Sequence, residues 1–178
     1  MEKVKMIIGI DPGLQGAITF LEQKVLRVYD LKSCIADTGT FHSLDPCLFR
    51  SLLTRAINNC PVEDIAVYCE ESLLIPGNGI KTSRIVYDSR GVMRTVFLLG
   101  GLDVNYVAPV TWKTYFNLKK ATKSDSVDRI LQYYPNSEHI YYRNFRNKKI
   151  LMDGRAESTL IALYGQSQQY NNYAKKTK

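Results

Sequence analysis

Short apolar runs in the first thirty residues have the pattern of buried strands. Residues 4–10 read Val-Lys-Met-Ile-Ile-Gly-Ile, rich in β-branched side chains, and the turn sequence Asp-Pro-Gly follows at 11–13. Residues 16–21 and 25–29 repeat this pattern with short turns between them. Because short connections join antiparallel neighbours, these three segments predict an antiparallel meander.

The next segment predicts a capped helix. Residues 31–45 show no strong pattern and are expected to form a loop. Asp45 then provides an N-cap, and Pro46 suits the first helical position. The expected apolar face of this helix consists of Leu48, Leu52, Leu53 and Ile57.

The remaining pattern alternates between strands and helices. A fourth strand is predicted at 64–70 and a fifth at 104–107, with a Pro-Gly-Asn-Gly loop within 73–83 and a helix at 85–99 between them. The last part of the chain predicts one or two short helices over 110–135, a polar, basic and aromatic loop over 136–150, and a helix from 153 to about 170. This order predicts an α/β fold whose mixed sheet combines the meander with two parallel strands and is flanked by helices. We expect one domain, residues 1–170, and a basic flexible tail at 171–178.

Charge is distributed unevenly along the chain. The protein has 178 residues and a net charge of +7. Residues 112–149 hold nine basic side chains against three acidic ones, a net +6. This block indicates a polyanionic partner, with nucleic acid as the first candidate, and a solvated basic face is an equally good alternative. The expected phosphate contacts are Lys113, Lys119, Lys120, Arg143, Arg146, Lys148 and Lys149.

Other compositional features narrow the class of protein. No run of about 18 apolar residues occurs, and the apolar segment near the N-terminus is too short for a signal peptide. We therefore expect no membrane association and a cytoplasmic location, with a compartment of a eukaryotic host as the alternative. Cysteines at 34, 47, 60 and 69 form no Cys-x-x-Cys pair, which favours free thiols over a zinc site.

Acidic residues recur where predicted elements begin or end. Asp11 ends the first strand, Glu70 and Glu71 end the fourth, and Asp153 and Glu157 lie one turn apart at the start of the last helix. Each has an ordinary alternative as a turn, surface or capping residue. Together, at the strand ends where open α/β sheets bind ligands, they predict an all-oxygen site for Mg²⁺ or Mn²⁺.

The motifs that contain these acids resemble those of the RuvC-type Holliday junction resolvases, over nearly the whole chain and in the same order. They are Ile8 to Gly13 with Gly16-Ala17-Ile18, then Glu70-Glu71 with Arg90-Gly91, then Pro109, Lys113 and Lys123 to Val127, and finally Asp153 to Ala162. The last two acids are four residues apart, where bacterial members usually have three, and a Glu replaces an Asp. In these motifs the residues are closer to those of phage-type members than to those of bacterial ones, and the resemblance implies a bacterial or phage-infected cell.

The resemblance implies a ribonuclease H-like fold and a crossover junction endodeoxyribonuclease. Its active site would hold two Mg²⁺ ions, or Mn²⁺ in their place, on Asp11, Glu70, Asp153 and Glu157, with Lys123 near the scissile phosphate. Glu71 is the alternative to Glu70, since strand alternation lets only one of them face the metal. Paired symmetric nicks in a four-way junction would leave 5′-phosphate and 3′-hydroxyl ends.

The same resemblance implies a homodimer, because a two-fold axis matches that of a four-way junction. The helix at 85–99 would form the interface, unless its apolar residues belong to the core. The residues concerned are Val86, Val92, Met93, Val96 and Phe97. In the basic block, Tyr141, Tyr142 and Phe145 either stack on an exposed base or pack under a loop.

Three other functions remain open at the level of the sequence. A nuclease of the same fold would act on flaps, replication intermediates or structured RNA, because fold and metal site do not fix the substrate. A non-catalytic junction-binding protein would have a degenerate acid cluster. A small-molecule phosphotransferase is disfavoured by the length of the chain and by the basic block.

Overall fold

A computed structural model describes residues 4–13, 15–37, 42–71, 79–119, 122–146 and 148–176. Its centre is a five-stranded sheet with the order β3-β2-β1-β6-β7. Strands β1 (Met6–Asp11), β2 (Ala17–Glu22) and β3 (Val25–Asp30) form the predicted antiparallel meander. Strands β6 (Ile65–Glu70) and β7 (Val104–Val107) extend the sheet parallel to β1, as predicted.

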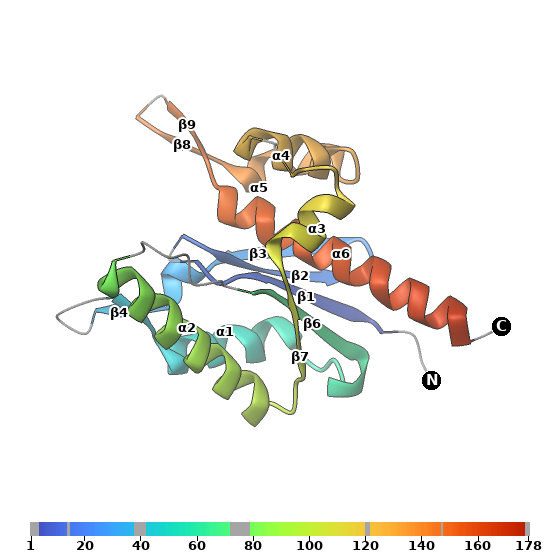
Figure 1. Cartoon of the computed structure of the whole chain (residues 1–178), viewed down its shortest axis with the longest axis horizontal. Helices are drawn as coiled ribbons and strands as arrows, with labels where there is room; N and C mark the ends of the chain where they lie inside the picture. The colour runs from blue at the N-terminus through green and yellow to red at the C-terminus, as the bar shows by residue number, and fades with distance from the viewer. Residues whose placement is uncertain are drawn as a thin grey trace.

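Helices cover both faces of this sheet (Figure 1). One face packs against α1 (Pro46–Ile57) and α2 (Ile80–Leu99). The other packs against α6 (Asp153–Lys176), with α3 (Pro109–Tyr115), α4 (Lys123–Leu131) and α5 (Glu138–Tyr141) grouped around its first half. Single 3₁₀ turns occur at Leu31–Cys34, Val62–Asp64 and Pro135–Ser137. None of the helices in the described part of the chain is both long enough and apolar enough to cross a membrane.

Two segments predicted as loops contain strands, so those predictions are wrong. A small hairpin, β4 (Ile35–Asp37) with β5 (His42–Leu44), lies within residues 31–45. A second hairpin, β8 (Tyr142–Phe145) with β9 (Lys148–Leu151), lies within residues 136–150. Both are short, and polar side chains on both faces of the second remove the alternation by which strands are recognised.

Two helices differ in detail from their predictions. Asp45 caps α1 as predicted, accepting from the backbone N–H groups of Cys47 and Leu48 at 2.8 and 2.9 Å. The buried face of α1 contains Leu52 and Leu53 as predicted, but it contains Phe49 in place of Leu48, which is exposed. Helix α6 continues to Lys176, beyond its predicted end near residue 170. The predicted loop at 73–83 lies mostly outside the described residues.

The apolar residues of α2 mostly belong to the core. Met93 and Phe97 are buried among the side chains of β1 and α1, and Val92 and Val96 pack against the same cluster. Phe97 meets the ring of Phe49 edge-on at 5.7 Å. A partner chain therefore has no access to Met93 or Phe97, and the predicted dimer contacts through them are wrong. The four cysteines are free, as predicted.

Helix α6 lies unusually close to the sheet because of Gly9 in the middle of β1. A Cβ atom at Gly9 would lie 2.3 Å from the carbonyl oxygen of Ser158 and 2.4 Å from the backbone nitrogen of Ala162. Both are backbone atoms of the helix, so a larger residue would force the helix away. This close packing places the start of α6 directly over the carboxyl ends of β1 and β6.

Candidate active site

Asp11 is the last residue of β1, and its side chain is held by the turn that follows. The Oδ1 atom accepts a hydrogen bond from the backbone N–H of Gly13 at 3.1 Å. The pKa of Asp11 is raised from 3.8 to about 7, mainly by burial and against the effect of this hydrogen bond. The carboxylates of Glu157, Glu70 and Asp153 contribute to this rise.

Glu70 ends β6, the parallel neighbour of β1, so the two acids lie at the same edge of the sheet. Its Oε2 atom accepts a hydrogen bond from the indole N–H of Trp112 at 2.8 Å. Burial raises the pKa of Glu70, and the bond from Trp112 opposes that rise. The carboxylate of Glu70, rather than that of Glu71, forms part of the acid cluster, whereas the backbone N–H of Glu71 donates to the Val107 carbonyl at 2.8 Å.

The third carboxylate comes from the first turns of α6. Carboxylate oxygens of Asp11, Glu70 and Glu157 lie within 4.8 Å of one another. The close approach of Gly154 to the β1–β2 turn allows this, since a Cβ there would lie 2.2 Å from the carbonyl oxygen of Gln15. The structure thus brings together three of the four predicted acids from three separate elements, and we refer to them as the carboxylate triad.

Asp153 lies beside the triad and is bound to a lysine. Its side chain forms an ion pair with Lys123, the first residue of α4, whose side chain is 72% exposed. Glu157 is paired in a similar way with Lys113 of α3, at 3.4 Å. Each of these two acids of α6 therefore forms an ion pair with one lysine. Metal binding by Asp153, and contact of Lys123 with a phosphate, stay predictions.

The donor set of the triad fits a hard divalent cation. It consists of carboxylate oxygens alone, which Mg²⁺ and Mn²⁺ prefer, and includes no sulfur or nitrogen that would favour zinc. Mutual repulsion and burial make three ionised carboxylates costly at this spacing unless a cation compensates them. Asp11, Glu70 and Glu157 are therefore the residues that would hold such an ion.

Trp112 is a site residue that the sequence did not reveal. It is fully buried, and its indole bridges the core and the carboxylate of Glu70. The neighbouring Lys113 was predicted to contact phosphate but lies against Glu157. The sequence offers only an aromatic residue and a lysine shortly after the fifth strand, and nothing in that pattern reveals which way the indole points.

The remaining predicted phosphate contacts lie mainly on the β8–β9 hairpin. Arg143 and Arg146 belong to its first half and Lys148 and Lys149 to its second, and all four are exposed. Lys119 is also exposed, after α3. Lys120 lies outside the described residues.

Comparison with known proteins identifies the architecture. No protein-family model matches the sequence, and neither does any curated protein. Among solved structures, T. thermophilus RuvC in complex with a Holliday junction substrate matches with a TM-score of 0.55 and 14% identity, over 94% of this chain and 96% of that chain. The yeast mitochondrial Holliday junction resolvase Ydc2 matches with a TM-score of 0.59 and 16% identity, over 100% of this chain and 86% of that chain. The chain has the RuvC fold.

The RuvC fold confirms the predicted class, a ribonuclease H-like α/β fold with a five-stranded mixed sheet flanked by helices. At 14–16% identity the likeness concerns the arrangement of the backbone. What this RuvC fold does in the present chain depends on the side chains at the ends of β1 and β6 and at the start of α6.

Proposed function

We propose that this protein is a metal-dependent endonuclease of the RuvC type that resolves four-way DNA junctions. The observation that carries the proposal is the carboxylate triad, in which Asp11, Glu70 and Glu157 converge within 4.8 Å at the carboxyl ends of parallel strands of the RuvC fold. Such a cluster serves phosphodiester hydrolysis, because divalent cations bound there activate a water molecule and stabilise the leaving 3′-oxygen. The products would carry 5′-phosphate and 3′-hydroxyl ends.

The residues around the triad have separate tasks in this proposal. Trp112 holds the Glu70 carboxylate in one orientation through its N–H donor. Asp153 would serve as a further ligand for divalent cations once Lys123 leaves it. The exposed ammonium group of Lys123 then lies next to the reacting phosphate and offsets the negative charge on its oxygens.

Three features support branched DNA as the substrate. Two lysines lie beside the acids, and the basic hairpin leads directly into the helix that carries Glu157, so both supply positive charge for a nucleic acid. T. thermophilus RuvC, which shares the fold, is known in complex with a Holliday junction substrate. Ydc2, which also shares it, is a Holliday junction resolvase.

A homodimer would place two such sites symmetrically on one junction. We assign its interface to a stripe on α2 formed by Tyr87, Gly91, Arg94 and Leu98. These positions lie on one helix face and are exposed. The stripe borders an open hollow of about 550 Å³ whose far wall includes Tyr106 of β7. Tyr87 and Leu98 are 54% and 69% exposed, which leaves apolar surface for a second copy to cover.

The decisive experiment is cleavage of a labelled immobile four-way junction in Mg²⁺ by the wild type and by Asp11→Asn. We expect symmetric paired nicks from the wild type, and junction binding without cleavage from the variant, because the substitution removes one ligand charge and leaves the basic surface intact. A flap, a structured RNA and a plain duplex are assayed in parallel. Preferential cleavage of the flap or of the RNA would mean that this nucleic acid, and not the four-way junction, is the substrate. The absence of any cleavage would refute the proposed nuclease activity.

A further inference from the structure

The β8–β9 hairpin has two chemically different faces. Side chains paired directly across antiparallel strands point to the same side, and successive side chains alternate. One face holds Tyr142 and Leu151, which pack against the core, and Lys149, which pairs with Glu138 of α5. The opposite face, which we call the outer face, consists of Arg143, Phe145, Lys148 and Ile150.

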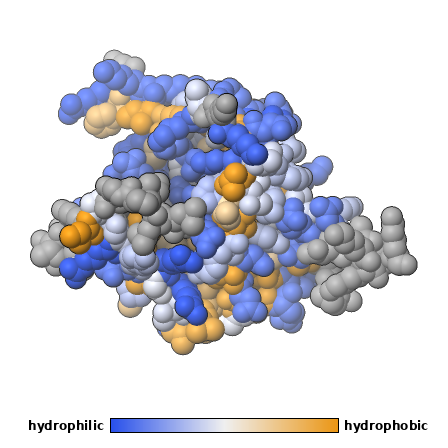
Figure 2. All heavy atoms as spheres, viewed as in Figure 1, coloured by the Kyte–Doolittle hydropathy of each residue, from blue (hydrophilic) through white to orange (hydrophobic). Residues whose placement is uncertain are grey.

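The outer face combines exposed apolar groups with unopposed positive charge. Phe145 is 49% exposed and Ile150 is 42% exposed. Neither Arg143 nor Lys148 forms an ion pair with any residue that the structure describes. The guanidinium of Arg146, at the turn, lies 5.2 Å from the centre of the Phe145 ring. Figure 2 shows a hydrophobic strip bordered by hydrophilic atoms on this projecting part of the molecule.

The hairpin is fastened to the start of the helix that carries Asp153 and Glu157. At its base, the backbone N–H of Met152 donates to the carbonyl of Tyr141 at 2.8 Å. Arg155, in the first turn of α6, donates to the Ile140 carbonyl at 2.9 Å. Through its other nitrogens it also binds both carboxylate oxygens of Asp30 on β3, at 2.6 and 2.7 Å.

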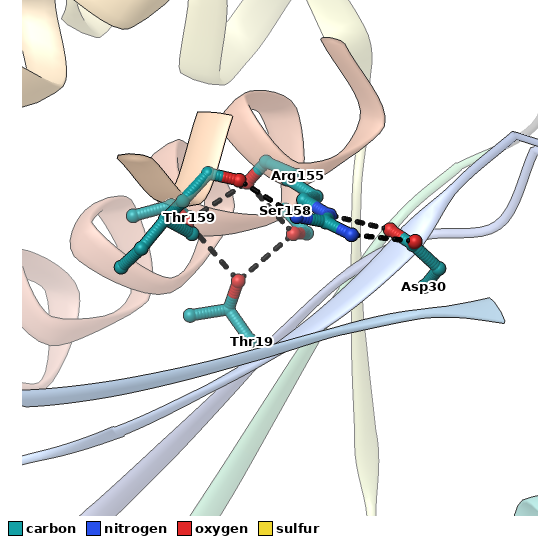
Figure 3. Close-up of polar contacts among 6 residues, drawn as sticks. Thr19, Asp30, Arg155, Ser158 and Thr159 are labelled. Carbon is teal, nitrogen blue, oxygen red and sulfur yellow. Dashed lines mark hydrogen bonds and ion pairs between the residues drawn. The ribbon is translucent and has the colours of Figure 1, made fainter. Parts of the chain in front are cut away.

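Buried hydroxyl groups also connect the first turns of α6 to the sheet. Figure 3 shows Arg155 reaching Asp30, with Thr19 beneath it between Ser158 and Thr159. The hydroxyl of Thr19 lies 2.8 Å from that of Ser158 and 3.1 Å from that of Thr159. The base of the hairpin, the first turns of α6 and the edge of the sheet are thus held as one unit. The tip extends from this unit by roughly 14 Å, given four residues per strand at about 3.4 Å each.

We propose that the outer face of the hairpin binds an unstacked nucleotide at the branch point of the DNA, with a base stacked on Phe145 and the flanking phosphates paired with Arg143 and Lys148. An exposed aromatic ring between cations is the arrangement that binds single-stranded nucleic acid irrespective of sequence. Four basic residues and no acidic ones within residues 142–151 make a polyanion the complementary partner. The proposal deepens the function proposed above and rests on it for the identity of the nucleic acid.

The test compares the affinities of Phe145→Ala and Phe145→Trp for three labelled DNAs in EDTA, where no metal supports cleavage. The DNAs are a four-way junction, an oligo-dT strand and a fully paired duplex. We expect Phe145→Ala to weaken binding of the junction and the single strand by about 5- to 100-fold with little change for the duplex, and Phe145→Trp to restore it. Leu48→Ala is the matched control, because Leu48 is also 49% exposed but lies on α1, across the sheet.

A second readout locates the contact. 5-Iodouracil at the branch point, irradiated in the complex, is expected to cross-link to Phe145, as peptide mapping by mass spectrometry would show. Equal losses on junction and duplex would instead mean that the hairpin lies in a groove, and unchanged affinity would mean that it does not bind DNA; either result overturns the proposal. The two proposals can fail separately. If the wild type cuts no branched DNA but Phe145→Ala selectively loses affinity for single strands, the proposed nuclease activity is refuted and the proposal for the hairpin is supported.

Discussion

At the scale of single residues, the buried carboxyl of Asp11 makes the metal-free protein sensitive to pH. Its pKa is about 7 in the folded state, raised first of all by burial, whereas the unfolded chain ionises near 3.8. The unfolded state therefore releases this proton at lower pH, so stability falls as pH rises from about 4 to 7. The shift corresponds to at most about 4 kcal/mol, at about 1.4 kcal/mol per pKa unit.

We therefore predict that the metal-free wild type melts at a lower temperature at pH 8 than at pH 5.5, and that Asp11→Asn flattens this dependence and melts higher at pH 8. Mg²⁺ should raise the melting temperature of the wild type more at pH 8 than at pH 5.5, because the cation needs ionised ligands. Calorimetry with EDTA or Mg²⁺ at both pH values measures this. A wild type that is more stable at pH 8 without metal would contradict the prediction.

Trp112 gives a second prediction at this scale. Trp112→Phe removes the indole N–H that donates to Glu70 and keeps an aromatic ring in the core. We expect Mg²⁺ affinity to drop by about 10- to 100-fold, since losing a group that orients a ligand typically has this effect. Phe116→Leu, in the same apolar cluster and without a polar contact to the triad, controls for core damage. Titration calorimetry measures the Mg²⁺ affinity of both variants. Equal affinities would refute the role of Trp112 in orienting Glu70.

The acids and Trp112 differ in how far the sequence reveals them. Asp11, Glu70 and Glu157 lie at the ends of elements that can be predicted from their hydrophobic patterns. Their convergence then follows from the topology of the sheet. Trp112 reaches Glu70 only because α3 returns over the ends of β6 and β7, a path set by tertiary packing. The choice between Glu70 and Glu71 likewise depends on the register of β6, which the sequence leaves open.

At the scale of elements, Arg155 and Asp30 join the base of the hairpin to the edge strand β3. Both side chains are mostly buried, and the contact uses two parallel charge-assisted hydrogen bonds. We predict a coupling free energy of about 1–3 kcal/mol between Arg155→Gln and Asp30→Asn, measured by urea unfolding of the two single variants and the double variant.

Hydrogen exchange gives this prediction a local readout. Amides of β8, β9 and the first turn of α6 should lose protection together in Arg155→Gln, while those of α1, across the sheet, stay unchanged. Arg155→Lys keeps the charge but lacks the planar fork, so it should rescue the protection only in part. Additive effects of the two substitutions, with no coupling, would show that the ion pair does not fasten the hairpin.

The elements also show where prediction from sequence ends. The five strands of the sheet were predictable because each is a short apolar run between turn residues. The β8–β9 hairpin was not, because its two faces carry cations and its apolar residues are spread over both. The predicted apolar face of α1 was wrong at Leu48, since Leu48 and Phe49 fit a helical period almost equally well and only packing against Phe97 selects the latter.

At the scale of the whole molecule, the structure separates two groups of cations within the basic block. Lys113 and Lys123 lie against the acids of α6, whereas Arg143, Arg146, Lys148 and Lys149 follow the projecting hairpin. Summed charge along the sequence predicted a polyanionic partner but could not separate these groups. In the function proposed above, the first set would act at the reacting phosphate, and the second set would hold DNA further along the hairpin.

The proposed resolution of a junction by paired nicks calls for two molecules related by a two-fold axis, and we propose the α2 stripe as their interface. We predict that the wild type is a dimer by analytical ultracentrifugation and that Leu98→Glu is a monomer, because a charge buried opposite its own symmetry copy is strongly unfavourable. Leu99→Glu is the control, since Leu99 is still more exposed, at 83%, but lies on a different face of α2. It should remain a dimer.

The same variants separate dimerisation from chemistry. On a supercoiled plasmid with an extruded cruciform, a dimer that cuts both strands within one complex yields linear DNA, whereas a monomer that cuts once yields a nicked circle. Leu98→Glu should therefore convert the product from linear to nicked while its carboxylate triad, on the opposite side of the sheet from the substitution, still binds Mg²⁺. Linear product from monomeric Leu98→Glu would show that the two cuts are independent, and the symmetry of the dimer would then have no part in resolution.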